Sequence, residues 1–375
     1  MRQMKYLFIN SVYGKRSTGK IVAKQCAELS SAGNECMVAY GRGEAEKGSV
    51  RTYRIGTRVG NAWHGLMSRL FDMQGLCSSA ATKKLIKVIH EYMPDVIWLH
   101  NLHGYYINYE ILFDALKSLQ GVKVYWTLHD CWAFTGHCAY FTAVGCEKWR
   151  TGCRKCIQKR AYPITIGADR SQRNYERKKA AFAGVGDLTL ITPSKWLAEL
   201  TRESFLSGYP VEVVYNTVDQ EIFKPTPNDV KNELGIADKK MILGVAVGWE
   251  ETKGMPDILR LRSLLSRNYV IVLIGEVSKK YRDLPEGILG IASIKDQKRL
   301  AQYYTAADVL INPTHQDNYP TVNLEAAACG TPVITYRVGG SSESVDPENV
   351  VEENDVSGMA ERIKSICSAE KKLFF

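Results

Sequence analysis

The stretch that most constrains the fold of this chain is residues 306–335. Two short runs rich in β-branched side chains, 309–311 and 333–335, predict strands of a buried sheet. Between them, Thr321 is expected to cap a helix that Gly330 ends. The segment therefore predicts two neighbouring strands joined by a short helix, with one loop held at the helix N-terminus.

This loop and helix contain the polar groups that a nucleotide-sugar needs. Asp317, Asn318 and Tyr319 would lie just before the helix, where backbone N–H groups and the helix dipole favour an anion such as a phosphate. Glu325, on the same helix, is placed to accept hydrogen bonds from paired hydroxyls such as those of a ribose. The alternative is a surface helix with solvated acids.

The segment DNYPTVNLEAAACGTPVIT resembles the acidic signature of the family 4 retaining glycosyltransferases, and it is most similar to the colanic-acid-type polysaccharide enzymes. In that signature seven residues separate two acids, as they do Asp317 and Glu325. The resemblance implies that Glu325 binds the donor ribose and that Asp317 contacts the donor sugar in catalysis. This chain has Asp where the broader family has Glu. The same resemblance implies further donor contacts at Asn318, Tyr319, Pro320 and Thr321.

At 375 residues the chain is too long for one ordinary hydrophobic core and suits two domains. The resemblance implies the α/β GT-B fold, in which two Rossmann-like, doubly wound parallel-sheet domains face each other across a cleft. We expect an acceptor-binding domain at 1–215 with a Cys-rich insertion at 131–160, and a linker at 216–227. A nucleotide-sugar-binding domain would follow at 228–355, and a helix at 356–375 would cross back to the first domain.

Charge is unevenly divided along the chain. Residues 1–200 hold 29 Lys and Arg against 15 Asp and Glu, whereas residues 201–375 hold 20 against 25. A basic first half predicts an anionic partner there. We favour an anionic membrane surface over nucleic acid, because the basic residues are interleaved with amphipathic helix patterns.

The sequence shows no run of about 18 apolar residues that would span a membrane. The first residues, MRQMKYLFIN, are interpreted as a strand and not as a signal peptide. We therefore expect a cytoplasmic protein, held peripherally on the inner face of the cell membrane.

Residues 61–77 place most of their large apolar side chains on one helical face. Stripes of this kind usually pack into the core of their own domain, which is the favoured interpretation. The alternative is a docking surface for the membrane or for a lipid-linked acceptor.

Two features of the first half fall at the carboxyl ends of predicted strands, where doubly wound sheets bind ligands. Gly14 and Gly19 lie in a strand-to-helix turn that is either an ordinary turn or, as the resemblance implies, a loop near the donor diphosphate. His129 follows the buried strand at 122–127. The resemblance implies that it lies beside the donor's anomeric centre, and Asp130 is expected to orient it.

The second half contributes two more strand ends. Lys253 would neutralise the diphosphate as a mobile charge, and Gly275 would face the base or the ribose. The family usually adds an arginine a few residues before the lysine, and this chain has none there. With Lys253 and the helix stabilising the leaving group, no catalytic metal is expected.

Five of the ten cysteines fall between residues 131 and 156. Disulfides are not expected in a cytoplasmic chain. A structural zinc site and a packed cluster of reduced thiols remain alternative interpretations, with His137 as an alternative zinc ligand. The zinc ligands would be Cys138, Cys146, Cys153 and Cys156.

Together these features predict a hexosyltransferase that uses a UDP- or GDP-sugar, with the retention of configuration that the resemblance implies. Its acceptor would be a growing cell-surface polysaccharide or lipopolysaccharide glycan, or a lipid-linked acceptor, and not a nucleic acid. One alternative is a nucleotide-sugar epimerase of similar fold, which needs no acceptor. Another is a non-enzymatic nucleic-acid- or surface-binding protein, which would leave the acidic signature unexplained.

Overall fold

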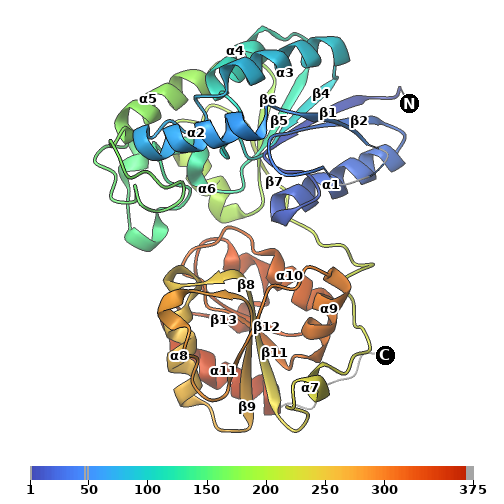
Figure 1. Cartoon of the computed structure of the whole chain (residues 1–375), viewed down its shortest axis with the longest axis vertical. Helices are drawn as coiled ribbons and strands as arrows, with labels where there is room; N and C mark the ends of the chain where they lie inside the picture. The colour runs from blue at the N-terminus through green and yellow to red at the C-terminus, as the bar shows by residue number, and fades with distance from the viewer. Residues whose placement is uncertain (1, 46–47, 49, 369–375) are drawn as a thin grey trace. The chain divides into compact units, whose positions relative to one another are not determined.

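The computed structural model describes residues 2–45, 48 and 50–368. The chain divides into two compact units, Met1–Tyr215 and Asn216–Phe375 (Figure 1). Each unit is built on its own parallel sheet with helices on both faces.

The sheet of the first unit has seven strands in the order β3-β2-β1-β4-β5-β6-β7, and every pairing is parallel. The strands are β1 (Lys5–Asn10), β2 (Glu35–Tyr40), β3 (Arg51–Arg54), β4 (Val96–Leu99), β5 (Lys123–Thr127), β6 (Leu188–Thr192) and β7 (Val211–Val213). The order reverses direction next to β1, so the loops after β1 and β4 flank the point where such sheets bind ligands.

Successive side chains of β1 enter different cores. Leu7 and Ile9 belong to the large core under α3 and α4, while Phe8 packs with Val22 and Cys26 of α1. This alternation is what a strand covered on both faces requires. The helices of the unit are α1 (Arg16–Ser31), α2 (Arg58–Phe71), α3 (Ser79–Tyr92), α4 (Tyr109–Ser118), α5 (Ser171–Phe182) and α6 (Lys195–Glu203).

The sheet of the second unit has six parallel strands in the order β10-β9-β8-β11-β12-β13. The strands are β8 (Lys240–Trp249), β9 (Tyr269–Val277), β10 (Ile288–Ile291), β11 (Val309–Asn312), β12 (Val333–Tyr336) and β13 (Val350–Val351). The reversal of strand order here falls between β8 and β11, which places the loops after these two strands at the ligand-binding edge.

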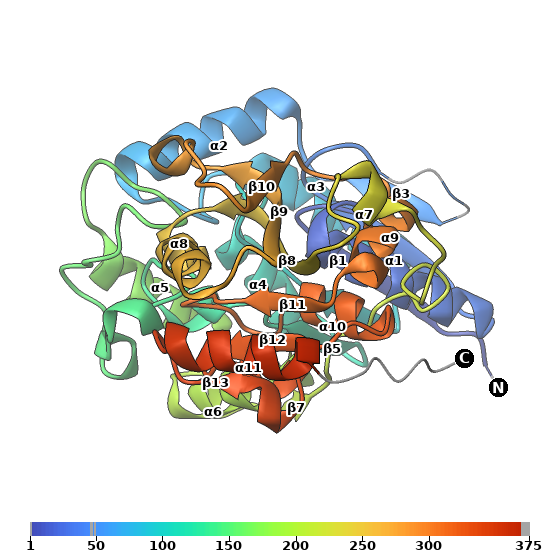
Figure 2. The ribbon, with the colours of Figure 1, turned by 90° about the horizontal axis from the view of Figure 1, so that it is seen from below.

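Helices cover both faces of this sheet as well. Figure 2 shows α8 and α11 on one face and α7, α9 and α10 on the other. Their bounds are α7 (Val230–Glu233), α8 (Met255–Leu264), α9 (Gln297–Ala306), α10 (Thr321–Ala328) and α11 (Val356–Ser368). Two parallel, doubly wound sheets confirm the predicted α/β class with two Rossmann-like domains.

The last helix packs on the second unit. Met359, Ala360 and Ile363 of α11 are buried in the core of that unit, against α8 and the sheet. Its predicted return to the first unit stays a prediction. The rest of the predicted segment, 369–375, lies outside the described residues.

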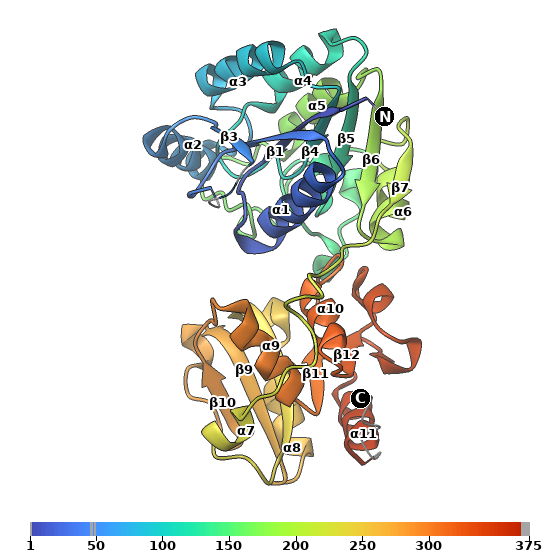
Figure 3. The ribbon, with the colours of Figure 1, turned by 90° about the vertical axis from the view of Figure 1, so that its right-hand side faces the viewer.

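The α2 helix also departs from the favoured interpretation. It lies at the β3 edge of the first unit (Figure 3), and its buried residues are the polar His64 and Ser68. His64 is anchored on both ring nitrogens: Nδ1 is 2.7 Å from Ser78 Oγ, and Nε2 accepts from the N–H of Gly75 at 3.1 Å. Because the polar side faces inward, the apolar stripe of this helix is exposed and is not core.

Candidate active site

In the second unit the structure brings together Lys253 and Asp317, two residues predicted to be catalytic. The short helix η4 (Glu251–Lys253) after β8 supplies the lysine, and the loop after β11 supplies the aspartate. Lys253 Nζ lies 2.9 Å from Asp317 Oδ2 and 3.4 Å from Thr314 Oγ1. Both side chains are partly exposed, so the pair is accessible to a ligand.

The loop that carries Asp317 is held by close backbone packing. Asp317 Oδ1 accepts from the N–H of Asn318 at 2.9 Å. Gly339, with a φ of +55°, lies so near that a Cβ there would be 2.1 Å from the carbonyl oxygen of Asp317. A side chain at position 339 would therefore displace the aspartate.

The residues that follow Asp317 lead directly into α10. Asn318 is buried, and the carbonyl oxygen of Tyr319 accepts from Asn216 Nδ2 at 3.3 Å. Thr321 does not cap the helix as predicted. The N-cap is Pro320, which has no side-chain donor or acceptor, and Thr321 is the first helical residue. Thr321 is a residue type that commonly caps helices, but it lies one position after the N-cap. Pro320 takes the N-cap position, where its backbone has the extended conformation that a cap requires.

Glu325 is oriented by a buried tyrosine. The hydroxyl of Tyr304, on α9, donates to Glu325 Oε2 at 2.8 Å. Burial, followed by the charge of Glu325, raises the pKa of Tyr304, so the phenol remains a donor at neutral pH. The carboxylate is thus held on the second turn of α10, and its assignment to ribose hydroxyls stays a prediction. The sequence did not predict the role of Tyr304, because no local pattern relates it to Glu325, 21 positions later.

Gly275 lies near the end of β9, beside the loop that follows β8. Its φ is +126°, and a Cβ there would be 2.0 Å from the carbonyl oxygen of Ala246. Trp249 Nε1 donates to the carbonyl of the preceding Ile274 at 3.1 Å. The glycine therefore allows the ends of β8 and β9 to lie against each other. Its predicted contact with the base or ribose stays a prediction.

In the first unit, His129 pairs with a second buried histidine, and its orientation by Asp130 stays a prediction. His129 Nε2 lies 3.0 Å from His100 Nδ1, and the two rings stack. Burial lowers the pKa of His129 to about 4, against an opposing contribution from Asp130. The ring is therefore neutral at pH 7.

The carboxylate of Asp130 orients a third histidine of this unit, His103. Its Oδ2 accepts from His103 Nε2 at 2.9 Å, and its Oδ1 accepts from the N–H of Trp132. His103 Nδ1 is then free to accept from the hydroxyl of Tyr162 at 2.9 Å. His103 falls at the end of a predicted strand. The sequence nevertheless did not predict this Tyr162–His103–Asp130 relay, because nothing in it relates His103 to Tyr162.

The turn that contains Gly14 and Gly19 joins β1 to α1. The N–H of Gly14 donates to the carbonyl of Gly19 at 3.0 Å, which closes the turn on the first residues of the helix. Asn10, at the end of β1, accepts from Ser11 N at 2.8 Å and from Asn101 N at 3.3 Å. The turn lies at the ligand-binding edge of the sheet, and its predicted contact with the donor diphosphate stays a prediction.

The four cysteines predicted to bind zinc do gather in space. They line one small cavity of about 20 Å³ together with His137. His137 Nδ1, however, is 2.6 Å from Asp72 Oδ1, and both side chains are buried. Within the described part of the chain, no three His, Cys, Asp or Glu side chains are arranged to hold a metal ion. The structural zinc site and the packed cluster of reduced thiols therefore both stay predictions.

Comparison with known proteins agrees with this arrangement. Residues 239–369 match the family described as "Glycosyl transferases group 1". The "Putative colanic acid biosynthesis glycosyl transferase WcaC" of Escherichia coli K12 is 26% identical over 270 residues, which cover 67% of this chain and 62% of that protein. A "D-inositol 3-phosphate glycosyltransferase" of Stackebrandtia nassauensis is 34% identical over 151 residues, covering 34% of this chain and 33% of the relative. The aligned region thus spans less than two thirds of either relative.

Solved structures match nearly the whole chain. Sucrose-phosphate synthase from Thermosynechococcus elongatus has a TM-score of 0.68 at 18% identity, covering 97% of this chain and 90% of that one. WaaG, a glycosyltransferase involved in lipopolysaccharide biosynthesis, has a TM-score of 0.65 at 15% identity, with coverage of 97% and 90%. Anabaena HepE, solved in complex with UDP-glucose, has a TM-score of 0.63 at 14% identity, with coverage of 98% and 90%.

The chain accordingly has the GT-B fold of glycosyltransferases. Within it, the region of the second unit that matches the group 1 glycosyl transferases, 239–369, includes Lys253, Asp317 and Glu325. No helix in the described ranges is long and apolar enough to cross a bilayer.

Proposed function

We propose that this protein is a retaining glycosyltransferase of the family 4 type that moves a hexosyl group from a UDP- or GDP-sugar to a growing glycan. The observation that carries the proposal is the grouping of the Lys253–Asp317 pair and the Tyr304-held Glu325 around the start of α10. These groups provide a cation for a diphosphate and a carboxylate for ribose hydroxyls.

In the proposed reaction, an acceptor hydroxyl oxygen bonds to the anomeric carbon as the bond from that carbon to the diphosphate oxygen breaks. The nucleoside diphosphate leaves with the bonding electrons, and the hydroxyl proton passes to the leaving phosphate or to water. Lys253 and the N-terminus of α10 would stabilise the developing negative charge, which is where fixed electrostatics contribute most. No metal ion is required for this step.

The comparisons support the donor and the type of acceptor at a general level. HepE was solved in complex with UDP and with UDP-glucose. WaaG is involved in lipopolysaccharide biosynthesis, and WcaC is named as a colanic acid biosynthesis glycosyl transferase. By analogy, the acceptor of this chain would be a cell-surface glycan or its lipid-linked precursor, assembled by a protein attached peripherally to the membrane.

The proposal is tested first by donor binding. Thermal shifts of the full chain with UDP-, GDP- and ADP-sugars should show stabilisation by one nucleotide class, since a ligand that binds only the folded state stabilises it. No shift with any of the three would contradict the proposal. Conversion of the donor sugar without any acceptor would instead identify an epimerase.

Turnover then tests the residues. Lys253→Ala and His129→Ala should each lower transfer by about one to several orders of magnitude, as the loss of one electrostatic stabiliser does. Lys364→Ala, which removes an exposed lysine of α11 in the same unit, serves as the control and should transfer normally. Normal transfer by both variants would show that the active site lies elsewhere in the protein.

A further inference from the structure

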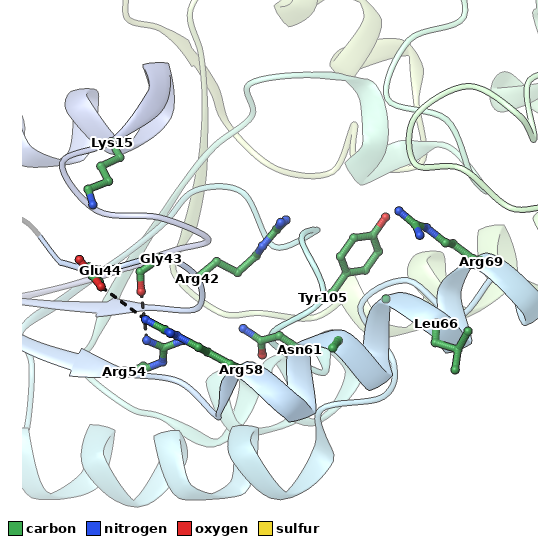
Figure 4. A pocket seen from close by; sticks show the side chains of 12 residues that line it. Lys15, Arg42, Gly43, Glu44, Arg54, Arg58, Asn61, Leu66, Arg69 and Tyr105 are labelled. Atoms are coloured by element: carbon green, nitrogen blue, oxygen red, sulfur yellow. Dashed lines mark hydrogen bonds and ion pairs between the residues drawn. The ribbon is translucent and has the colours of Figure 1, made fainter. Parts of the chain in front are cut away.

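A large cavity in the first unit is not used by the proposed donor site. It has a volume of about 820 Å³ and lies where the loops after β1, β2, β3 and β4 meet. Among the described residues that line it, the charged side chains are five cations and one carboxylate (Figure 4): Lys15, Arg42, Arg54, Arg58, Arg69 and Glu44. Parallel sheets bind their ligands at this edge, so the cavity is placed to receive one.

Only part of this positive charge is neutralised within the cavity. Arg58 lies 3.4 Å from Glu44, and Arg54 Nη1 donates to the carbonyl of Gly43 at 3.0 Å. Among the described residues, no carboxylate forms an ion pair with any of the other three cations, which are Lys15, Arg42 and Arg69. A ligand with more than one negative charge would neutralise these cations. A phosphate group fits them, because each planar guanidinium group can donate two hydrogen bonds to phosphate oxygens.

The cavity is continuous with the exposed apolar face of α2. Leu66 lines the cavity and is also 47% exposed. Trp63, one turn earlier, is 59% exposed, and Leu70 and Phe71 continue the same surface. Monomeric proteins rarely expose large contiguous apolar patches, and such patches usually mark an interaction site. The inward-facing His64 and Ser68 keep this face directed outward.

We propose that this cavity binds the phosphate or diphosphate group of a lipid-linked acceptor, whose apolar chain lies along the exposed face of α2. The proposal rests on the proposed function, since it names the acceptor of the same transferase. A soluble anion alone would leave the apolar face unexplained, and a bilayer alone would leave a deep cationic cavity unexplained.

The position of the cavity agrees with an acceptor site. Arg42 lies over the ring of Tyr105, at 5.7 Å, and both line the cavity. Tyr105 also follows His103 by two residues in the loop after β4, so the cavity adjoins the Tyr162–His103–Asp130 relay. A sugar attached to a phosphate bound here would lie beside polar groups of the same unit.

Calorimetry with the full chain in neutral detergent tests the proposal. The ligands are geranylgeranyl diphosphate, inorganic pyrophosphate and geranylgeraniol, which separate the contributions of charge and chain. We expect geranylgeranyl diphosphate to bind at least about tenfold more tightly than either of the others, because it uses both surfaces. The double variant Arg42→Gln/Arg69→Gln should weaken both phosphate ligands, whereas Trp63→Ser should weaken both prenyl ligands and leave pyrophosphate binding unchanged.

Two exposed residues of the same unit supply matched controls: Arg173→Gln and Val144→Ser should bind as the unchanged protein does. Equal affinity for pyrophosphate and geranylgeranyl diphosphate would overturn the lipid part of the proposal and indicate a soluble phosphorylated acceptor. Binding to phosphatidylglycerol vesicles without binding to geranylgeranyl diphosphate would overturn it in favour of a membrane surface. UDP-glucose thermal shifts provide a separate readout: binding of the amphiphile without any nucleotide-sugar would reject the proposed function and leave this site intact.

Discussion

Glu325 shows how one hydrogen bond prepares a side chain for its proposed task, because Tyr304 holds its Oε2 at 2.8 Å. We expect Glu325→Ala to weaken binding of the preferred nucleotide-sugar by about 2 to 4 kcal/mol, since two charge-assisted hydrogen bonds to the ribose are lost. Isothermal titration calorimetry measures the change. Glu325→Gln is the informative second variant, because its amide oxygen still accepts from Tyr304 while the charge is removed.

The two variants separate binding from folding. Removing the carboxylate leaves the buried hydroxyl of Tyr304 without this acceptor, so Glu325→Ala is expected to lose some stability as well. If both variants bind the donor with unchanged affinity, Glu325 does not contact the ribose.

A second residue-scale prediction concerns His64 and acid. Burial lowers the pKa of His64 to about 4, from an ordinary value near 6.5. Between these two pH values the unfolded chain binds a proton that the folded chain does not. Stability is therefore lost as the pH falls from about 6.5 towards 4, by about 3 kcal/mol for this group. Protonation would also end the hydrogen bond that Nε2 accepts from Gly75.

His64→Gln cannot titrate, so it should lose less stability than the unchanged protein between pH 7 and pH 4.5. The measurement is urea unfolding of the first unit at both pH values, and the quantity compared is the difference between them. Equal losses in the two proteins would show that folding does not lower the pKa of His64. His129, whose pKa is also lowered to about 4 by burial, contributes to the same acid sensitivity with the same sign.

At the scale of elements, the cysteine-rich insertion is a compact, irregular segment. Its three short helices, η1 (Cys131–Phe134), η2 (Thr142–Val144) and η3 (Lys148–Arg150), enclose buried aromatic rings. Phe141 and Trp149 stack at 5.0 Å, and Phe134 lies 5.4 Å from Trp149. Aromatic packing therefore provides a core for the insertion without a metal.

This packing predicts that the thiols are free to react. A hydrogen bond from the thiol of Cys138 lowers the pKa of Cys156 to about 7, and the same interaction raises the pKa of Cys138. At pH 8, iodoacetamide should modify Cys156 before Cys138, because the thiolate is the reactive form. Peptide mass spectrometry measures the order, with Cys156→Ser as the control.

Protection of these thiols from alkylation would contradict this prediction. Thiols that resist alkylation until a chelator is added, together with about one zinc ion released per chain, would establish the metal site that the cysteine spacing predicts.

At the scale of the whole molecule, the uneven charge predicts where the protein attaches to a membrane. The excess of basic residues lies in the first 200 positions, and Lys83, Lys84 and Lys87 are exposed on α3. Each basic residue near an anionic surface contributes about 1 kcal/mol. We expect sedimentation with phosphatidylglycerol liposomes at low salt and much less with neutral ones.

The interaction should weaken as salt rises, because screening limits such charges to about 8 Å at physiological ionic strength. Replacing Lys83, Lys84 and Lys87 together by glutamine should reduce sedimentation, whereas Lys279→Gln in the second unit should not. Equal sedimentation with anionic and neutral liposomes would exclude binding to an anionic membrane surface. The excess of basic residues in the first half would then be explained by a small phosphorylated acceptor.

The amino-acid sequence by itself determined the fold class, and it indicated which residues of the second unit follow parallel strands and so make up the proposed donor site. Short runs of β-branched residues such as 309–311 form strands wherever they are buried on both faces, and residues that follow parallel strands meet at one edge. For that reason Lys253 and Asp317, 64 positions apart, could be placed together in advance, and the structure pairs them at 2.9 Å.

Only the tertiary structure decided which partners and which faces are used. Asp130 is adjacent to His129 in sequence, yet the backbone turns its carboxylate to His103. Periodicity shows which side chains of α2 share a face, but not which face is buried. That choice depends on His64, whose hydrogen bonds to Ser78 and Gly75 are made by segments beyond the helix. Hydrogen bonds between distant segments are long-range and directional, so no local pattern predicts them.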